Sequence, residues 1–262
     1  MIELPSVRRS FRMVQRNLLV YKHTWMVIFS GFFEPLFYLL GIGYGMGAFI
    51  GDIPLADGRS IPYAAFVAPA LLAQASMNGA IAESIFNVFF KLNFSKTYDA
   101  ILATPLGIRE IAVGEMLWSL FRGTLYVFAF VGVMVGMGLV ISPMLFLVIP
   151  ASILIGAAFS AACLATTAYL RTVQDFDLPM GLVVMPMFLF SATFFPISVY
   201  DPFPLLKIVI EATPLFHAVS LLRGLATGIV GWHELWDVAY LVAFGAIAMW
   251  IALNRLEQRL IK

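Results

Sequence analysis

Four charged residues of this sequence interrupt long apolar runs: Glu34, Glu83, Glu115 and Arg122. A charge surrounded by apolar residues is costly, so such groups pair with one another, face water or carry function. Glu83 and Arg122 fall toward the same predicted side of neighbouring runs, which predicts an ion pair between them. Glu115 lies seven residues before Arg122, on the same face of a helix. Glu34, beside Pro35, allows two interpretations: a polar group on a conduit, or a carboxylate bonded to a neighbouring helix.

Other patterns that carry chemistry are missing from the sequence. It contains no GxxxxGK[ST] phosphate-binding loop, no HExxH and no Cys-x-x-Cys. The one cysteine, Cys163, lies in an apolar run and is expected to be a small buried residue. The histidines, His23, His217 and His233, do not form a metal-binding pattern. We therefore predict no catalytic residue and no metal site, and the sequence does not favour a membrane-embedded enzyme.

The composition identifies the surroundings of the chain. The 262 residues are 61% hydrophobic and 12% charged, whereas soluble domains carry about 25% charged residues. So much apolar surface exceeds what one soluble core of this size can bury, which indicates a lipid bilayer. The net charge of +1 gives no indication of a nucleic-acid partner.

Apolar segments of suitable length predict an all-α polytopic membrane protein with six transmembrane helices in a single domain, residues 1–262. A crossing needs roughly 17–25 apolar residues, or a few more with tilt. No charged residue occurs from Gly123 to Leu170, a length that needs two crossings with a turn at Ser142-Pro143. The predicted spans are residues 25–50, 61–90, 116–141, 143–170, 178–197 and 238–253.

The basic residues predict the orientation. Twelve lysines and arginines lie in the N-terminal segment, in alternate loops and at the C-terminus, and only three lie in the intervening loops. Since lysine and arginine are enriched on the cytoplasmic side, both termini are expected in the cytoplasm of a bacterial cell. An even number of crossings satisfies this arrangement.

Three further segments are predicted not to cross the membrane. Residues 6–22 place Val7, Phe11, Val14, Leu18 and Leu19 among arginines at helical spacing, which predicts an amphipathic helix on the cytoplasmic surface. Residues 91–115 are long for a connection and are expected to hold a short cytoplasmic helix. Residues 198–237 are apolar but interrupted by prolines, which favours outer re-entrant helices.

Several segments together resemble one family. YDAILATPLGIREIAVGEMLW (Tyr98–Trp118) resembles the cytoplasmic coupling segment of type-2 ABC exporter permeases. DFDLPMGLVVMPMFLFSATFFPIS (Asp175–Ser198) resembles their fifth span, and TPLFHAVSLLRGLATG (Thr213–Gly228) their outer re-entrant stretch. Glu34-Pro35 and the glycines after it fit the first span. The similarity covers nearly the whole chain and is greatest to permeases for nodulation lipo-oligosaccharide, daunorubicin-type drugs and cell-surface polysaccharides.

The resemblance implies a set of partners. It implies two cytoplasmic ABC ATPase subunits and a second permease, either another copy of this chain or a similar protein. ATP and magnesium would bind to the ATPase, and no cofactor would bind directly to this chain. It also implies that the region from Tyr98 to Glu110 docks on the ATPase. The candidate coupling residues are Tyr98, Asp99, Thr104, Pro105, Arg109 and Glu110, and the second cytoplasmic loop adds Arg171, Asp175 and Asp177.

The resemblance leaves the substrate open between a lipid-linked saccharide or glycolipid, which is favoured, and a hydrophobic drug. Either would move outward through the bacterial cytoplasmic membrane. The alternative function is an ion-coupled secondary transporter or channel. That alternative requires an ion site at mid-membrane depth, for which Glu34 is the available candidate.

Overall fold

The computed structural model describes residues 7–22, 33–55 and 57–260. In these ranges five helices are long and apolar enough to cross a bilayer: Phe33–Ile50, Tyr63–Asn93, Ile108–Gly136, Leu145–Tyr169 and Trp232–Leu260. A sixth segment passes the same test if the bent pair Pro204–Glu211 and Pro214–Thr227 counts as one span. The predicted class, a helical polytopic membrane protein, is therefore confirmed. Residues 25–32 of the first predicted span, together with His23, lie outside the described residues.

The helices follow one another with short connections. In chain order the elements are α1 (Val7–Tyr21), α3 (Phe33–Tyr38), η1 (Leu39–Met46), α4 (Gly47–Ile50), β1 (Asp52–Pro54), β2 (Ser60–Pro62), α5 (Tyr63–Ile81), η2 (Ala82–Asn87), α6 (Val88–Asn93), α7 (Thr97–Leu102), α8 (Ile108–Gly136), α9 (Leu145–Tyr169), η3 (Gln174–Phe176), η4 (Leu178–Val184), α10 (Met185–Phe190), η5 (Ile197–Tyr200), α11 (Pro204–Glu211), α12 (Pro214–Thr227) and α13 (Trp232–Leu260). Strands β1 and β2 form a short antiparallel hairpin, which the all-α prediction did not include.

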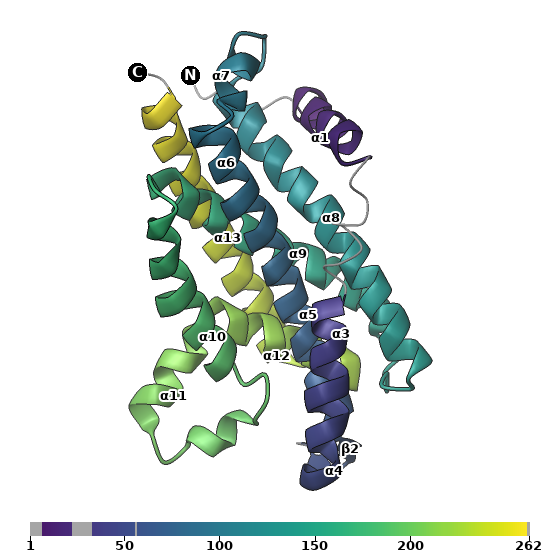
Figure 1. Cartoon of the computed structure of the whole chain (residues 1–262). Coiled ribbons are helices and arrows are strands. Elements are labelled where there is room, and N and C mark those ends of the chain that lie inside the picture. The colour runs from purple at the N-terminus through teal and green to yellow at the C-terminus, as the bar shows by residue number, and fades with distance from the viewer. Residues whose placement is uncertain (1–6, 23–32, 56, 261–262) are drawn as a thin grey trace.

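A central helix organises the fold. Helices α5, η2 and α6 form one continuous helix, Tyr63–Asn93, and 94% of its most apolar stretch is buried. It is buried because α8, α9, α12 and η1 pack around it. Its upstream half, AAFVAPALLAQAS, is rich in alanine, and small side chains let helices approach closely. Figure 1 shows this helix running between α8 on one side and α13 on the other.

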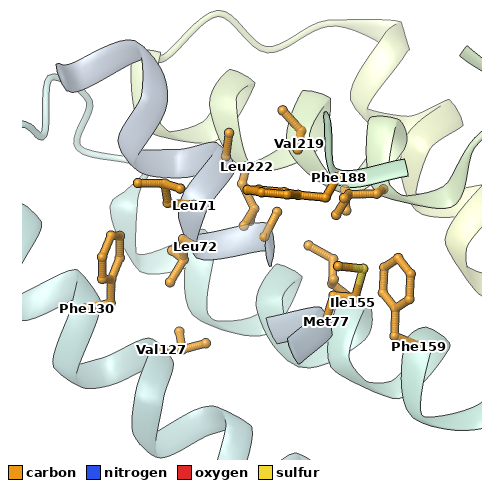
Figure 2. Packing of buried hydrophobic residues seen from close by; sticks show 14 of the residues in the cluster. Leu71, Leu72, Met77, Val127, Phe130, Ile155, Phe159, Phe188, Val219 and Leu222 are labelled. Carbon is orange, nitrogen blue, oxygen red and sulfur yellow. The ribbon is translucent and has the colours of Figure 1, made fainter. Parts of the chain in front are cut away.

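The apolar core joins the central helix to its neighbours. In Figure 2 the side chains of α5 meet those of α8, α9, α10 and α12 in one cluster. Its labelled members are Leu71, Leu72, Met77, Val127, Phe130, Ile155, Phe159, Phe188, Val219 and Leu222. Small residues bring α9 and α13 close together, since a Cβ on Gly245 would lie 3.0 Å from Ala158 Cα.

The two ends of the molecule differ in content. Helix α7, the start of α8, and the C-terminal end of α13 lie at one end (Figure 1), and α1 lies beside α8 toward that end. Helix α4, the hairpin and α11 lie at the other end. The basic α1 and the basic end of α13 thus share one side of the molecule.

Helix α1 presents two different faces. Ser10, Met13 and Asn17 form a buried stripe that packs on α8. Phe11, Leu18 and Leu19 are at least half exposed, so three of the apolar side chains that suggested an interfacial helix point away from the protein, whereas Val14 is buried against it. An apolar face directed outward suits the predicted position at a membrane surface.

Helix boundaries differ from the predictions in three places. The third span extends from Ile108 rather than residue 116, and the last span covers Trp232–Leu260 rather than 238–253. The fifth is shorter: its helix ends at Phe190 instead of residue 197, so Leu178–Phe190 does not reach the length of a crossing. The helix stops because Ala192 adopts a positive φ of 58°, outside the helical region.

The apolar segment after the fifth helix folds back as a bent pair. Helices α11 and α12 meet at 76°. On α12, Arg223 donates to Ala192 O at 2.8 Å and lies over the Phe66 ring at 3.8 Å. His217 Nδ1 lies 2.6 Å from Asp237 Oδ1, which ties α12 to α13. Backbone ends that leave a helix at membrane depth need such protein partners.

Candidate functional site

A buried ion pair joins the central helix to α8. The Glu83 carboxylate accepts a hydrogen bond from Arg122 Nη1. Glu83 also accepts from Trp118 Nε1 at 3.0 Å and from Asn87 Nδ2 at 2.8 Å. The predicted ion pair is therefore present, and donors occupy both carboxylate oxygens. Arg122 additionally donates to Tyr126 Oη at 2.9 Å, as a buried charge requires if it is to remain ionised.

The π-helical turn η2 places the residues of this cluster. Glu83 and Asn87 both belong to η2, whose wider turn interrupts the regular helix between α5 and α6. Such single turns inside α-helices occur often at functional sites. Asn87 Nδ2 also donates to Tyr21 Oη at 3.1 Å, so the cluster reaches the end of α1.

A second buried cluster surrounds Glu115 on α8. Its carboxylate accepts from Lys91 Nζ at 2.8 Å, from Tyr98 Oη at 3.1 Å and from Asn17 Nδ2 at 3.3 Å. Burial, the adjacent Glu115 charge and the hydrogen bond to Glu115 raise the pKa of Tyr98 well above its usual value, so the phenol stays protonated and donates. This one carboxylate joins α1, α6, α7 and α8.

Close packing also holds α1 against α8. A Cβ on Gly114 would lie 2.5 Å from Met13 Cβ, so only glycine allows α1 this close. Arg9 Nη1 donates to Pro105 O at 3.3 Å, which ties α1 to the loop between α7 and α8. Helix α1, the α7 segment and the first half of α8 are therefore held together by several independent contacts.

The segment from Phe94 to Pro105 forms an exposed tip around α7. Phe94 is 63% exposed, and Lys96, Asp99, Thr104 and Pro105 are exposed as well. Of the predicted coupling residues, Asp99, Thr104 and Pro105 thus lie on an accessible surface. Tyr98 is only 1% exposed, because its ring faces the core and its hydroxyl binds Glu115. Its predicted role in ATPase coupling stays a prediction, and such a role would act through this buried anchor.

Arg109 and Glu110 have intramolecular roles at the start of α8. Arg109 Nε lies 3.1 Å from Glu257 Oε1 on α13. The Glu110 carboxylate accepts from the Gly107 backbone N–H at 3.0 Å and so caps α8. Whether they also dock on an ATPase stays a prediction, but any force on them passes into α8 and α13.

The second loop between spans is held by Asp175. Its Oδ2 accepts from the backbone N–H of Arg171 at 2.8 Å and of Thr172 at 2.9 Å, and these bonds lower the pKa of Asp175 below its ordinary value. Asp177, two residues later, is exposed where η4 begins. The carboxylate of Asp175 therefore shapes the turn that ends α9.

Glu34 borders a small polar cavity between α3, α5 and α8. The cavity holds about 100 Å³, and its polar lining is Glu34, Gln74, Asn78, Arg122 and Tyr126. Asn78 Nδ2 donates to Glu34 Oε1 at 3.3 Å, which agrees with a carboxylate bonded to a neighbouring helix. Gln74 also lines the cavity, but its Oε1 is fully covered by neighbouring atoms and has no hydrogen-bond partner among the described residues. The polar atoms that a molecule in the cavity could reach therefore belong to the other side chains, such as Glu34 and Asn78.

A larger apolar cavity lies on the other side of the central helix. It holds about 610 Å³, is open on one side, and is lined by α5, η2, α9, η4, α10, α11, α12 and α13. Its walls include Met77, Ile85, Phe159, Leu182 and Val209. The chain therefore has a polar hollow and an apolar hollow separated by the same helix.

No metal-binding group was found in the described parts of the chain, where no three or more of His, Cys, Asp and Glu converge. Cys163 is buried, as its apolar context predicts. Carboxylate–cation pairs organise the two buried polar clusters.

Sequence reasoning missed Asn17, Lys91 and Trp118 as partners of the buried carboxylates. Asn17 belongs to the Ser10–Met13–Asn17 spacing, which marks the protein-facing side of α1, yet polar residues at those positions look solvent-exposed in the sequence. Lys91 follows the last apolar residue of its span, so it was counted only as a cytoplasmic charge.

Comparisons with known proteins identify the family. The sequence profile described as ABC-2 type transporter matches residues 9–226. The chain is similar to Nodulation protein J of Sinorhizobium fredii, with 28% identity over 94% of this chain and 92% of that protein. It is 30% identical to Nodulation protein J of Rhizobium leguminosarum bv. viciae, over 80% of this chain and 78% of that protein. It is 26% identical to Nodulation protein J of Rhizobium meliloti, over 94% of this chain and 92% of that protein. No solved structure matches.

The buried ion pair yields a prediction about stability. Glu83→Gln should lower the free energy of unfolding by about 3–5 kcal/mol, because it leaves Arg122 buried without its counter-charge. Adding Arg122→Met to Glu83→Gln should recover most of that loss. The unaltered protein, the two single variants and the double variant form a double-mutant cycle, and denaturant titration in detergent micelles measures the free energy of unfolding of each. Asp201→Asn removes the exposed pair with Lys207 and should leave the free energy nearly unchanged. Additive losses in the cycle would contradict the pairing.

Proposed function

Because the chain belongs to the ABC-2 type transporter family, we propose that it is the membrane subunit of an ATP-driven exporter that moves an amphipathic substrate out of the bacterial cytoplasm. The chain is a multi-pass integral membrane protein, and its family implies a partnership with ABC ATPase subunits. ATP and magnesium then belong to the ATPase. The proposed assembly has two ATPase subunits and two permeases, with a second copy of this chain as the favoured partner.

The exposed tip around α7 is the observation that carries this proposal. A docking element must be accessible to its partner and also stiffly connected to the spans. Asp99, Thr104 and Pro105 are accessible, while Tyr98 anchors the same helix to buried Glu115. Movement imposed on α7 would therefore reach α8 and α1 together, as a rigid-body shift between two packed states requires.

The orientation of the chain is part of the proposal. ATPase docking requires the α7 tip to face the cytoplasm, as do α1 and the end of α13, which lie toward the same end of the molecule (Figure 1). The hairpin and the η5–α11 turn would then face outward. The basic residues of α1 and of α13 support this direction.

The larger cavity supports a substrate with an apolar part. Its apolar walls border about 610 Å³, which suits a lipid or other hydrophobic group. The cavity on the other side of the central helix offers Glu34 and Asn78 to hydroxyl groups and holds only about 100 Å³. We favour a lipid-linked saccharide or glycolipid over a hydrophobic drug because it combines an apolar part with hydroxyl groups. The function remains ATP-driven in either case; transport sustained by an ion gradient without ATP would favour the secondary-transporter alternative.

The coupling proposal predicts the effect of a charge reversal at the tip. Asp99→Lys should lower transport-linked ATP hydrolysis by about fivefold or more, because a typical coupling free energy is about 1–3 kcal/mol. The measurement is ATP turnover by the complex reconstituted in liposomes with its ATPase. The matched control is Asp201→Lys. Asp201 is exposed and lies shortly before α11, the helix at the opposite end of the molecule (Figure 1), so this variant should leave turnover unchanged. Equal ATP turnover by both variants would contradict a role for α7 in coupling ATP hydrolysis to transport.

The orientation predicts labelling from one side only. In a Cys163→Ser background, which removes the buried thiol, Lys96→Cys should react with an impermeant maleimide only after the cytoplasmic side is opened. Asp201→Cys should react in intact cells. If Lys96→Cys reacted in intact cells and Asp201→Cys did not, the chain would have the opposite orientation. That result would contradict the proposed contact between α7 and an ATPase.

The substrate assignment predicts the effect of Asn78. Asn78→Leu removes an amide that lines the small cavity, so it should raise the lipid-linked saccharide concentration for half-maximal ATPase stimulation about tenfold. Ser152→Ala removes a buried hydroxyl group away from this cavity and should leave stimulation unchanged. Stimulation of the unaltered complex by a hydrophobic drug and not by the saccharide would contradict the assignment.

A further inference from the structure

Three arginines surround a hollow where α9 and α13 end. The hollow holds about 420 Å³, and its lining is Ala168, Tyr169, Arg171, Arg255, Gln258 and Arg259. It lies at the C-terminal end of α13, and so on the side of the molecule that carries α7 (Figure 1). It is separate from the polar and apolar cavities proposed for the substrate.

The protein fixes two of the three guanidinium groups in place. Arg259 donates to Thr167 O at 3.2 Å, to Ala168 O at 3.1 Å and to Asn93 Oδ1 at 2.7 Å. Arg255 donates to Gln258 Oε1 at 3.0 Å and lies over the Tyr169 ring at 4.7 Å. Such contacts reduce the entropy that a ligand would otherwise lose in ordering these long side chains.

The three positive charges have no carboxylate partner in the described residues. None of Arg171, Arg255 and Arg259 forms an ion pair there, and the charges of Arg171 and Arg255 act unfavourably on Arg259. Two carboxylates on the same segments are engaged elsewhere. Asp175 accepts backbone N–H groups, and Glu257 pairs with Arg109. The hollow therefore holds positive charge that an anion would relieve.

We propose that this hollow binds a phosphate group. Guanidinium groups present paired N–H donors that match the oxygens of a phosphate and remain charged at all physiological pH values. Fixed arginines around one hollow can bind several oxygens of the same phosphate. Neither the family nor the transport function requires such a site, so the inference goes beyond the proposed function.

The surroundings favour a phospholipid headgroup as the source of the phosphate. Val173 and Leu178, which follow Arg171 in the sequence, are exposed apolar side chains that acyl chains can cover. Tyr169 lies one helical turn after Thr166, which lines the large apolar cavity. An anionic phospholipid places its charge beside the arginines and its tails beside these residues. Free inorganic phosphate shares the headgroup chemistry but not the apolar contacts.

The test compares ligand binding by the purified full-length chain in detergent. The probes are short-chain phosphatidylglycerol and inorganic phosphate, titrated separately and followed by thermophoresis. The test variant is Arg171→Gln/Arg255→Gln; Arg259 is kept because it holds the last carbonyl groups of α9. The matched control is Lys22→Gln/Lys96→Gln, which removes the same charge from exposed positions outside the hollow. Thermal unfolding of both variants checks that the fold is intact.

The site predicts that the arginine variant binds phosphatidylglycerol at least about tenfold more weakly, whereas the lysine control binds as the unaltered chain does. Binding of both probes, each weakened in the arginine variant, would support a site for phosphate alone. Binding of the lipid only would support a phospholipid site. Equal affinities in the two variants, or no binding of either probe, would overturn the proposal.

Discussion

A carboxylate buried inside the protein must be saturated with hydrogen-bond donors, and this requirement determines how the helices of this protein meet. Glu83 and Glu115 are 2% and 3% exposed, and each accepts hydrogen bonds from at least three side chains. Those donors come from α1, η2, α6, α7 and α8. Since an unpaired buried charge costs several kcal/mol, these helices cannot separate without losing much of the stability of the fold.

The same requirement makes one end of the molecule stiff. The Glu115 cluster holds α7 through Tyr98 and α1 through Asn17, and the Arg109–Glu257 pair extends the contact to α13. A force applied to the exposed tip would therefore move several helices as one body. Coupling between an ATPase and the transport route needs such a shared element with two packed states, and it does not need a chain of residues acting as a wire.

The sequence predicted the helical class because span length and charge exclusion follow directly from bilayer physics. It also predicted the Glu83–Arg122 pair, since two opposite charges at similar depth have few alternatives. It could not predict that Tyr98 faces inward, because a six-residue helix such as α7 offers too little periodicity to identify its buried side. The short fifth helix was missed for a related reason: residues 191–197 are apolar enough to continue a span, and only the backbone turn at Ala192 ends it.

The first span leaves much more of its surface uncovered than the central helix does. Only 17% of the apolar stretch Phe33–Ile50 is buried, compared with 94% for the central helix that it packs against. Exposed leucines and phenylalanines on such a helix can face lipid, but Glu34 is also exposed there. A carboxylate facing hydrocarbon would be costly, and the hydrogen bond from Asn78 Nδ2 meets part of its need for donors. In the proposed assembly, water or a second permease facing this surface would meet the rest.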